Sequence, residues 1–452
     1  MSVVSIRRSA DGRWAGAVWG PSPAKRGAFL LDRLVASRES GVRVSALGRD
    51  RAGEMRLFRF LHNARVTPDE MVRTARARTL ARVEGRHLLA IQDTTSLRDA
   101  SNTSGRSLQL HPMIAVDALD NSLVGLIEAQ LLERSGGQRA TKRERPFDQK
   151  QSRRWLDATI SSAALLDAGA ASVTVIADRE SDIYEEFALR PPSVELVIRA
   201  QQDRNLAEGG SLDRCLDGWP ELGREAVELP AGPGRKARTA VFALRARRVR
   251  IKAPSRDGWA VGSAPLPAEV ALWLVEAREI DPPKDAEPVH WRLLTTHAAP
   301  DLAAARRIIG FYRQRWTIEQ LFRVMKTKGF DIEASRVEEG GPFENLAVAT
   351  LIASIQVLQM VHERDGAGHR PLTDVFDAAD QPAMAAICAD LEGKTERQKN
   401  PHPPNSLAWA AWICARLGGW TGYYGKPGPI TIHRGRLQLM HMLYAWRLSR
   451  LV

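Results

Sequence analysis

The sequence SVTVIAD, residues 172–178, gives the clearest indication of the fold class of this chain. Its first six residues are small, β-branched or apolar, as in a buried strand, and the predicted strand ends directly at Asp178. A second stretch of the same form, LLAIQD at residues 88–93, predicts a strand that ends at Asp93. A helix is predicted between the two strands, at 155–168. Strands that alternate with a helix in this way indicate an α/β fold.

The segments around these strands predict the rest of the first half of the chain. Residues 1 to about 70 are expected to be helical and basic, and a further helix is expected at 69–84. Two apolar runs, 113–116 and 123–126, flank the turn-forming sequence ALDN and indicate a hairpin. The polar and basic segment 134–154 is expected to be a loop.

The second half of the chain changes from short β runs to helices. From about 192 to 298, short β runs between Gly- and Pro-rich turns predict a β-rich insertion in the α/β core. Asp301 is expected to cap a helix at its N-terminus, and more helix is expected at 344–364. The chain is therefore predicted to have three domains: a helical one at 1–70, an α/β one at 71–370 and a helical one at 371–452.

The charge of the chain favours a polyanionic partner. Its 452 residues include 65 Lys plus Arg against 53 Asp plus Glu, which gives a formal net charge of +12. Most of the basic residues are arginine, whose fork of donors suits phosphates and base edges. A basic excess of this size is typical of nucleic-acid-binding proteins, although ribosomal and membrane-surface proteins show it too. Because 44% of the residues are hydrophobic, global disorder is not expected.

Cysteines and apolar runs indicate the compartment. The three cysteines lie far apart without metal-ligand spacing, so we expect no disulfide framework or zinc site, and a reducing cytoplasm. The first residues, MSVVSIRRSADGRWAG, contain no apolar segment of a secretory signal. The most apolar long run, Leu346–Val361, is interrupted by polar residues and predicts a buried core helix rather than a membrane span. We therefore expect a soluble intracellular protein with no membrane partner.

The segment YRQRWTIEQLFRVMK, residues 312–326, carries the strongest local pattern. On one continuous helix, at about 100° per residue, four side chains would share an arc of about 60°. These four residues are Tyr312, Arg315, Glu319 and Lys326. Taken alone, such a stripe is usually a solvated charged face with salt bridges within the helix.

The two strand-end aspartates give that stripe a second interpretation. Ligands of open α/β sheets commonly bind at the C-terminal ends of strands, although an aspartate there also caps turns. Together with Glu319, Asp93 and Asp178 would form an all-oxygen site, which suits Mg²⁺ or Mn²⁺ rather than zinc. Two such ions can activate a water or a 3′-hydroxyl and stabilise the leaving oxygen of a phosphodiester.

Three ordered motifs give the chain a resemblance to a known family. They are LLAIQDTTSL around Asp93, VIADRESDIYEEF around Asp178, and the Tyr-x2-Arg-x3-Glu-x6-Lys pattern within residues 312–326. In these motifs, and in the supporting stretches FRFLHNARVTP, PPKDAEPVHWRLLTT and SLAWAAWICARLGGW, the chain resembles bacterial cut-and-paste transposases of the insertion sequence four family, the group of the transposon-five transposase. The resemblance runs in order from about Met55 to the end of the sequence. It implies a ribonuclease H-like core, with which the order of the predicted strands and helix is compatible.

The resemblance implies roles for individual residues. Asp93, Asp178 and Glu319 would be the catalytic residues and would bind the metal, two Mg²⁺ ions for which Mn²⁺ can substitute. A second set would contact DNA: Tyr312, Arg315, Lys326, Trp291, Arg323 and Arg59. Within that set, Tyr312, Arg315 and Lys326, the signature residues of the family pattern, would bind phosphates near the cleaved transposon end. The indole of Trp291 would stack on a base flipped out of that end, unless it is a core aromatic.

The resemblance also implies an assembly. The N-terminal domain would bind transposon-end double-stranded DNA, and residues 371–452 would supply the dimer contacts of a synaptic complex that captures target DNA. The insertion carries a basic stretch within 235–252, which is either a phosphate-contact surface or a solvated strand face. The expected location is the bacterial cytoplasm, in association with the nucleoid.

These inferences predict a Mg²⁺-dependent DDE transposase that cleaves transposon ends, forms a hairpin there and transfers the strand to target DNA. Two alternatives stay open. A nuclease of the ribonuclease H class would share the three carboxylates but would not need the signature residues around them. A catalytically silent, domesticated DNA-binding regulator derived from a transposase would be favoured by loss of a carboxylate, and none of the three is missing.

Overall fold

The computed structural model describes most of the chain beyond residue 49. The described residues are 50–97, 107–134, 147–229, 237–254, 260–261, 264–283, 287–326, 329–335, 337, 340–423 and 425–449, together with Leu30, Leu31, Leu34, Val42 and Leu47. Most of the segment predicted to be helical at 1–70 therefore lies outside them. Its last part forms α3 (Arg51–Leu61), which begins where the side chain of Asp50 accepts the backbone N–H of Gly53 at 2.6 Å.

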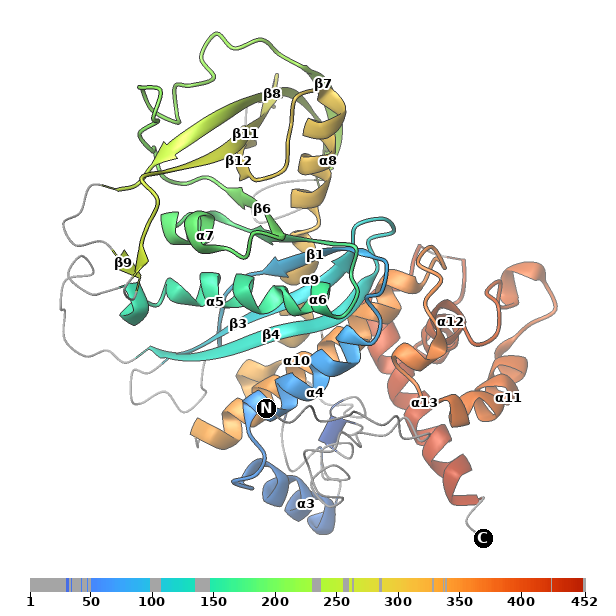
Figure 1. The fold of residues 1–452 in the computed structure, drawn as a ribbon. Coiled ribbons are helices and arrows are strands. Elements are labelled where there is room, and N and C mark those ends of the chain that lie inside the picture. The colour runs from blue at the N-terminus through green and yellow to red at the C-terminus, as the bar shows by residue number, and fades with distance from the viewer. Residues whose placement is uncertain are drawn as a thin grey trace. The chain divides into compact units, whose positions relative to one another are not determined.

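The chain folds as two compact units (Figure 1). Unit 1 comprises Met1–Arg82, Thr94–Gly136 and Thr317–Val452. Unit 2 comprises Val83–Asp93 and Gly137–Trp316. Both units contain helices and strands, so the mixed α/β class expected from the sequence is confirmed.

The strands of unit 2 form one sheet in the order β1-β5-β6-β12-β11-β8-β7 (Figure 1). Their bounds are β1 His87–Gln92, β5 Ser172–Ala177, β6 Val194–Arg199, β7 Gly223–Leu229, β8 Arg238–Lys252, β11 Glu269–Ile280 and β12 His290–Thr295. The first three strands of this order are parallel neighbours, and the remaining neighbours are antiparallel. Two short strands, β9 (Ala260–Val261) and β10 (Ala264–Pro265), pair separately.

The insertion is β-rich as predicted, but it begins later and is simpler than the sequence indicated. The strand expected at its start, β6, pairs in parallel with β5 and thus belongs to the α/β core. In place of the short β runs expected there, residues 238–252 form one long strand, β8, and β11 pairs with it from Lys252 to Val241. The sheet of the core therefore continues into the insertion without a break.

Helices α5 and α8 pack against this sheet. Helix α5 (Arg153–Ser162) contacts β1 and β5, and α8 (Leu302–Arg313) contacts β5, β6, β8 and β11. The cap predicted for α8 is confirmed, since the side chain of Asp301 accepts the backbone N–H of Ala304 at 2.8 Å. The single helix predicted at 155–168 is instead two, α5 and α6 (Ala164–Asp167). The other helical segments of unit 2 are η1 Phe147–Gln149, η2 Arg179–Ser181 and α7 Tyr184–Leu189.

Unit 1 combines an antiparallel hairpin with long helices. The hairpin predicted around residues 113–126 is confirmed as β3 (Ser107–Asp117) and β4 (Leu123–Arg134), and β2 (Thr95–Leu97) pairs with β3. Helices α4 and α10 pack against β4. Besides α3, the helices among its described residues are α4 Pro68–Leu80, α9 Trp316–Lys326, α10 Gly340–Glu363, α11 Gln381–Leu391, α12 Leu407–Leu417 and α13 Pro429–Ser449. Its 3-10 turns there are η3 Ile332–Ala334, η4 Leu372–Asp374, η5 Ala378–Asp380 and η6 Glu396–Gln398.

Helix α10 is the core helix expected from the apolar run Leu346–Val361. By length and composition it is the one helix among the described residues that could cross a membrane, but 89% of its most apolar window is buried inside the structure. Its polar residues are accommodated by hydrogen bonds, for example from the amide of Gln359 to the carbonyl oxygen of Val124 at 2.9 Å. The prediction of a buried core helix is confirmed.

Helices α12 and α13 approach closely because of two glycines. A Cβ atom added to Gly435 would clash with the carbonyl oxygen of Cys414. A Cβ atom added to Gly418 would clash with the carbonyl oxygen of Thr431. Backbone atoms cannot rotate away as a side chain can, so a larger residue has to push the two helices apart.

Replacement of Gly435 by alanine is therefore expected to destabilise unit 1 by about 2–3 kcal/mol. Thermal unfolding monitored by circular dichroism would measure this loss. Gly310→Ala is the matched control: it also lies within a helix, nothing lies within 4 Å of its added Cβ, and alanine there should stabilise by up to about 1 kcal/mol. An unchanged melting temperature for Gly435→Ala would contradict the close approach of the helices.

Candidate active site

The aspartates predicted from the sequence end two adjacent parallel strands of unit 2. Strands β1 and β5 pair in register, with Ile91 opposite Ile176. Asp93 and Asp178 each follow two residues later, so they lie at the same edge of the sheet on neighbouring strands. Both side chains are half-buried. The topology therefore places two carboxylates side by side at the C-terminal ends of parallel strands, where ligands of α/β sheets bind.

Each carboxylate has a defined partner within unit 2. Arg315 donates from Nη1 to Oδ2 of Asp93 at 2.9 Å, and its side chain is 14% exposed. Asp178 accepts the backbone N–H of Glu180 on Oδ1 at 2.9 Å and thereby starts the turn η2. Arg315 was expected to contact DNA, and the structure adds this contact with a predicted metal ligand.

A second arginine, which the sequence did not single out, lies in the field of both aspartates. Arg154, at the start of α5, pairs with Glu180 at 2.9 Å and its side chain is 9% exposed. Burial lowers the pKa of its guanidinium, while the charges of Glu180, Asp178 and Asp93 act in the opposite direction. The strand-end aspartates are thus flanked by two largely buried guanidinium groups. Nothing in the local sequence distinguishes Arg154 from its neighbour Arg153, whose side chain is more exposed.

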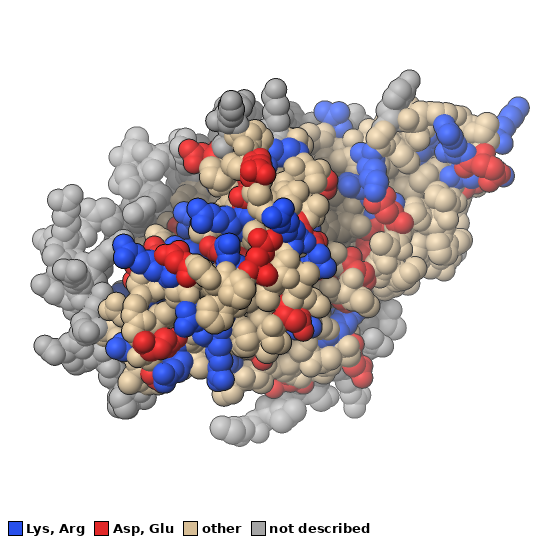
Figure 2. Space-filling view, turned by 90° about the horizontal axis from the view of Figure 1, so that it is seen from above, with Lys and Arg blue, Asp and Glu red and all other residues tan. Residues whose placement is uncertain are grey.

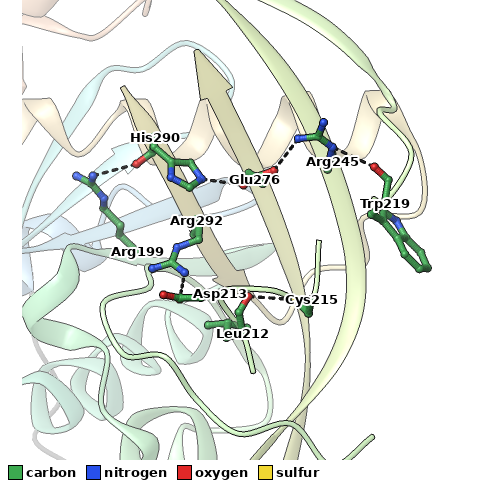
Figure 3. A network of polar contacts seen from close by, with 9 residues as sticks. All are labelled: Arg199, Leu212, Asp213, Cys215, Trp219, Arg245, Glu276, His290 and Arg292. Carbon is green, nitrogen blue, oxygen red and sulfur yellow. Dashed lines mark hydrogen bonds and ion pairs between the residues drawn. The ribbon is translucent and has the colours of Figure 1, made fainter. Parts of the chain in front are cut away.

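Tyr312 and Arg199 are hydrogen-bonded to each other, and Tyr312 lies within the electrostatic influence of Asp178. Burial raises the pKa of the Tyr312 hydroxyl, Arg315 and Arg199 oppose that shift, and Asp178 adds to it. Burial lowers the pKa of the Arg199 guanidinium, because it disfavours the charged form, and the Arg199 side chain is hydrogen-bonded to Tyr312. Arg199 also donates to the carbonyl oxygen of His290 at 3.1 Å (Figure 3). Tyr312 is 2% exposed, so its hydroxyl is held in place by the protein.

Trp291 is a buried aromatic in this structure. Its indole stacks on Phe242 with ring centroids 5.3 Å apart, and it meets Tyr312 edge to face at 5.6 Å. Only 6% of the residue is exposed. The contribution that the structure shows is packing behind Tyr312, which is the core interpretation considered above. Stacking of Trp291 on a flipped base stays a prediction, and it requires a ring face to be uncovered.

The prediction that residues 312–326 lie on one continuous helix is wrong. Helix α8 ends at Arg313, the N–H groups of Gln314 and Arg315 bond to carbonyls three residues earlier, and α9 begins at Trp316. These tighter bonds rotate the chain between the two helices, so the four side chains do not share one continuous face. Tyr312 and Arg315 belong to unit 2, whereas Glu319 and Lys326 belong to unit 1.

The remaining predicted site residues lie in unit 1. Glu319 is half-buried in the first turn of α9, and Lys326 in its last turn bonds the carbonyl oxygen of Ser96 at 2.5 Å and Glu333 at 3.2 Å. Arg323 on α9 and Arg59 on α3 are exposed. No group of three or more His, Cys, Asp and Glu in the described part of the chain has the arrangement of a metal site.

Much of the charge on the insertion is neutralised across strands. Of its predicted basic stretch, Arg238, Arg245 and Arg250 pair with glutamates of β11. The carboxylate of Glu276 accepts a hydrogen bond from Arg245 at 3.1 Å and pairs with the imidazole of His290 at 2.7 Å. Figure 3 draws both contacts. Figure 2 shows acidic and basic side chains interspersed on the face in view. The solvated strand face thus accounts for these three arginines, while Arg248 and Lys252 are exposed and Arg235 and Lys236 lie outside the described residues.

Comparison with known proteins places these residues in a family. Residues 70–355, well over half of the chain, match the family model described as Transposase DDE domain, and this range contains Asp93, Asp178 and Glu319. Among solved structures, the chain is similar to the cryo-EM structure of the piggyBac transposase synaptic complex with hairpin DNA. The two are 9% identical with a TM-score of 0.38, over 96% of this chain and 75% of that chain, so this likeness adds nothing to the assignment. On the family match, the chain belongs to the proteins with a transposase DDE domain.

Proposed function

We propose that this chain is a Mg²⁺-dependent cut-and-paste transposase that cleaves transposon ends, forms a hairpin there and joins the freed strand to target DNA. The observation that carries the proposal is the pair of aspartates at the ends of adjacent parallel strands, within a transposase DDE domain. We also propose a ribonuclease H-like core for this domain. The parallel strands β1, β5 and β6, with α5 packed on the first two, support that core.

The donor set fits divalent metal ions. Asp93, Asp178 and Glu319 would hold two Mg²⁺ ions, or Mn²⁺ in their place, because carboxylate oxygens are the ligands that these hard cations prefer. Chain connectivity supports the inclusion of Glu319: Arg315, which contacts Asp93, precedes it by about one helical turn. Bound metal ions would supply activation of the attacking oxygen and stabilisation of the leaving oxygen.

The protein's own cations would orient the DNA backbone. Arg315 and Arg154 flank the aspartates, and a guanidinium in a partly desolvated site binds a phosphate through two parallel hydrogen bonds. Tyr312, fixed by Arg199 and Trp291, would hold the same phosphate from the side. Lys326 would bind phosphates near the cleaved transposon end together with Tyr312 and Arg315, and Arg323 and Arg59 would contact DNA as well. The preorganised positive charge would stabilise the charge that develops at the phosphate during transfer.

The proposed partners are transposon-end double-stranded DNA, target DNA and a second copy of the chain in the synaptic complex. Residues 1–70 would bind the transposon end and residues 371–452 would contribute the dimer contacts, on either side of a catalytic domain at 71–370. We propose a bacterial cytoplasmic protein that associates with the nucleoid.

The proposal is tested by incubating the full chain with DNA that carries the terminal repeats flanking its gene. With Mg²⁺ or Mn²⁺ we expect nicked ends, hairpin ends and joined products, and with EDTA we expect DNA binding alone. Products would be resolved on denaturing gels, and binding would be followed by mobility shift. Binding without cleavage in either metal would replace the proposal with the silent regulator. Cleavage without joining would replace it with a hydrolytic nuclease.

A further inference from the structure

A buried polar network lies behind the two strand-end aspartates. Gln92 is the last residue of β1 and directly precedes Asp93, so its side chain points to the opposite face of the strand. Its amide Nε2 donates to Oγ1 of Thr159 on α5 and to Oε1 of Glu186 on α7, both at 3.1 Å. The position of Gln92 therefore fixes the backbone from which Asp93 projects.

The carboxyl group of Glu186 also reaches the segment that follows Asp178. Its Oε2 accepts a hydrogen bond from the hydroxyl of Ser181 at 2.5 Å, and Ser181 is the last residue of the turn that Asp178 caps. Its Oε1 additionally accepts the hydroxyl of Thr159 at 2.7 Å. The carboxyl group of Glu186 thus bonds Gln92, next to Asp93, and Ser181, three residues after Asp178.

Burial of this carboxyl group costs free energy, because the group loses its hydration. Glu186 and its three partners Gln92, Thr159 and Ser181 are all fully buried. Burial raises the pKa of Glu186 to about 7, against the three hydrogen bonds, which favour the ionised form. A purely structural contact at this position could be made by an aliphatic side chain without the desolvation of a carboxyl group. Directional hydrogen bonds, in contrast, fix the relative position of the groups that they join.

We infer that Glu186 is a positioning residue, which sets the spacing of the Asp93 and Asp178 carboxylates by holding Gln92 and Ser181 on its two oxygens. The inference rests on the proposed function, in which these aspartates hold the metal ions. Groups behind metal ligands typically change metal affinity by about 10–100-fold when they are removed. Glu186 would therefore act on metal binding without touching the metal, the DNA or the reacting atoms.

The test measures Mn²⁺ affinity by electron paramagnetic resonance, on the full chain bound to a transposon-end duplex. Glu186→Ala should weaken Mn²⁺ binding by about 10–100-fold. Glu186→Gln should stay within about threefold of wild type. Its amide oxygen can still accept the hydrogen bonds from Gln92 and Thr159, and its NH2 group can donate to the hydroxyl oxygen of Ser181, so both links are kept. Cleavage rates of the alanine variant should recover as the Mn²⁺ concentration is raised, which a merely unstable variant would not show.

Glu363→Ala is the matched control. Glu363 is a carboxyl group in α10 of unit 1, 2% exposed, and burial raises its pKa to about 7 as well. Its replacement should lower the melting temperature and leave the Mn²⁺ affinity of the folded protein unchanged. If Glu186→Ala fails to fold, Ser181→Ala takes its place, since it removes one hydrogen bond and creates little empty space.

The outcomes separate this inference from the proposed function. If wild type binds no Mn²⁺, or if Asp93→Asn binds Mn²⁺ as tightly as wild type does, the proposed function fails. If that Mn²⁺ site exists and folded Glu186→Ala, or Ser181→Ala in its place, binds with wild-type affinity, the positioning role is overturned. A loss in Glu186→Gln as large as in Glu186→Ala would also overturn it, because charge rather than hydrogen bonding would then be responsible.

Discussion

Replacement of Asp178 by asparagine should reduce strand cleavage and strand transfer by at least about 1000-fold while the protein still binds transposon-end DNA. Asparagine keeps the size of the side chain, and its oxygen can still accept the backbone N–H of Glu180 that starts η2. The substitution therefore removes a negative charge and leaves the local turn in place. Single-turnover cleavage with Mg²⁺ and a mobility-shift titration would measure the two quantities.

Glu180 provides the control for Asp178. It is two residues away, its side chain is 63% exposed, and it pairs with Arg154. Glu180→Gln removes the same charge from the same segment. Because Glu180 is exposed and an amide oxygen can still accept the hydrogen bond from Arg154, we expect less than about a fivefold loss of cleavage. Comparable losses of cleavage in the two variants would mean that cleavage depends on the negative charge of this segment and not on a metal ligand at Asp178. Full activity of Asp178→Asn would exclude Asp178 as a metal ligand.

Replacement of Arg204 by methionine should destabilise unit 2 by about 3–5 kcal/mol. Arg204 bonds Oδ1 of Asp182 through Nε at 3.0 Å and through Nη2 at 2.5 Å, and Nη2 also bonds the Asp182 carbonyl at 2.7 Å. The Asp182 side chain is fully buried and also accepts the backbone N–H groups of Gln201 and Gln202. Methionine fills similar space but leaves a buried carboxylate without its cation.

The expected loss would appear as a fall in the melting temperature of about 6–20 °C, measured by scanning calorimetry. Arg214→Met is the control, because Arg214 is exposed and lies ten residues further along the same segment. It should change the free energy of unfolding by no more than about 0.5 kcal/mol. Equal melting temperatures for Arg204→Met and Arg214→Met would show that the buried pair contributes nothing net.

The parts of the fold that the sequence predicted are those encoded locally. The strands ending at Asp93 and Asp178 are short apolar runs bounded by polar residues, and the cap at Asp301 depends on a neighbour three residues away. Parallel pairing then brings the aspartates to one edge, so this half of the candidate site follows from two motifs and a topology.

Features that depend on distant partners could not be predicted. The break between α8 and α9 coincides with the contact of Arg315 to Asp93, which is more than two hundred residues away in sequence. Burial of Glu186 and Arg154 is likewise set by elements that pack on them, since charged residues carry no local signal of burial.

The uninterrupted sheet of unit 2 makes its insertion a rigid arm. Strand β8 is the fourth neighbour from β5 in the order β5-β6-β12-β11-β8, and at about 4.8 Å per strand it lies about 19 Å from the edge that carries Asp178. That offset cannot change without breaking backbone hydrogen bonds between strands. A DNA strand bound on β8, for example by Arg248 or Lys252, would therefore be held at a fixed distance from the aspartates. Lengthening or shortening the loops that connect the strands would leave this distance unchanged.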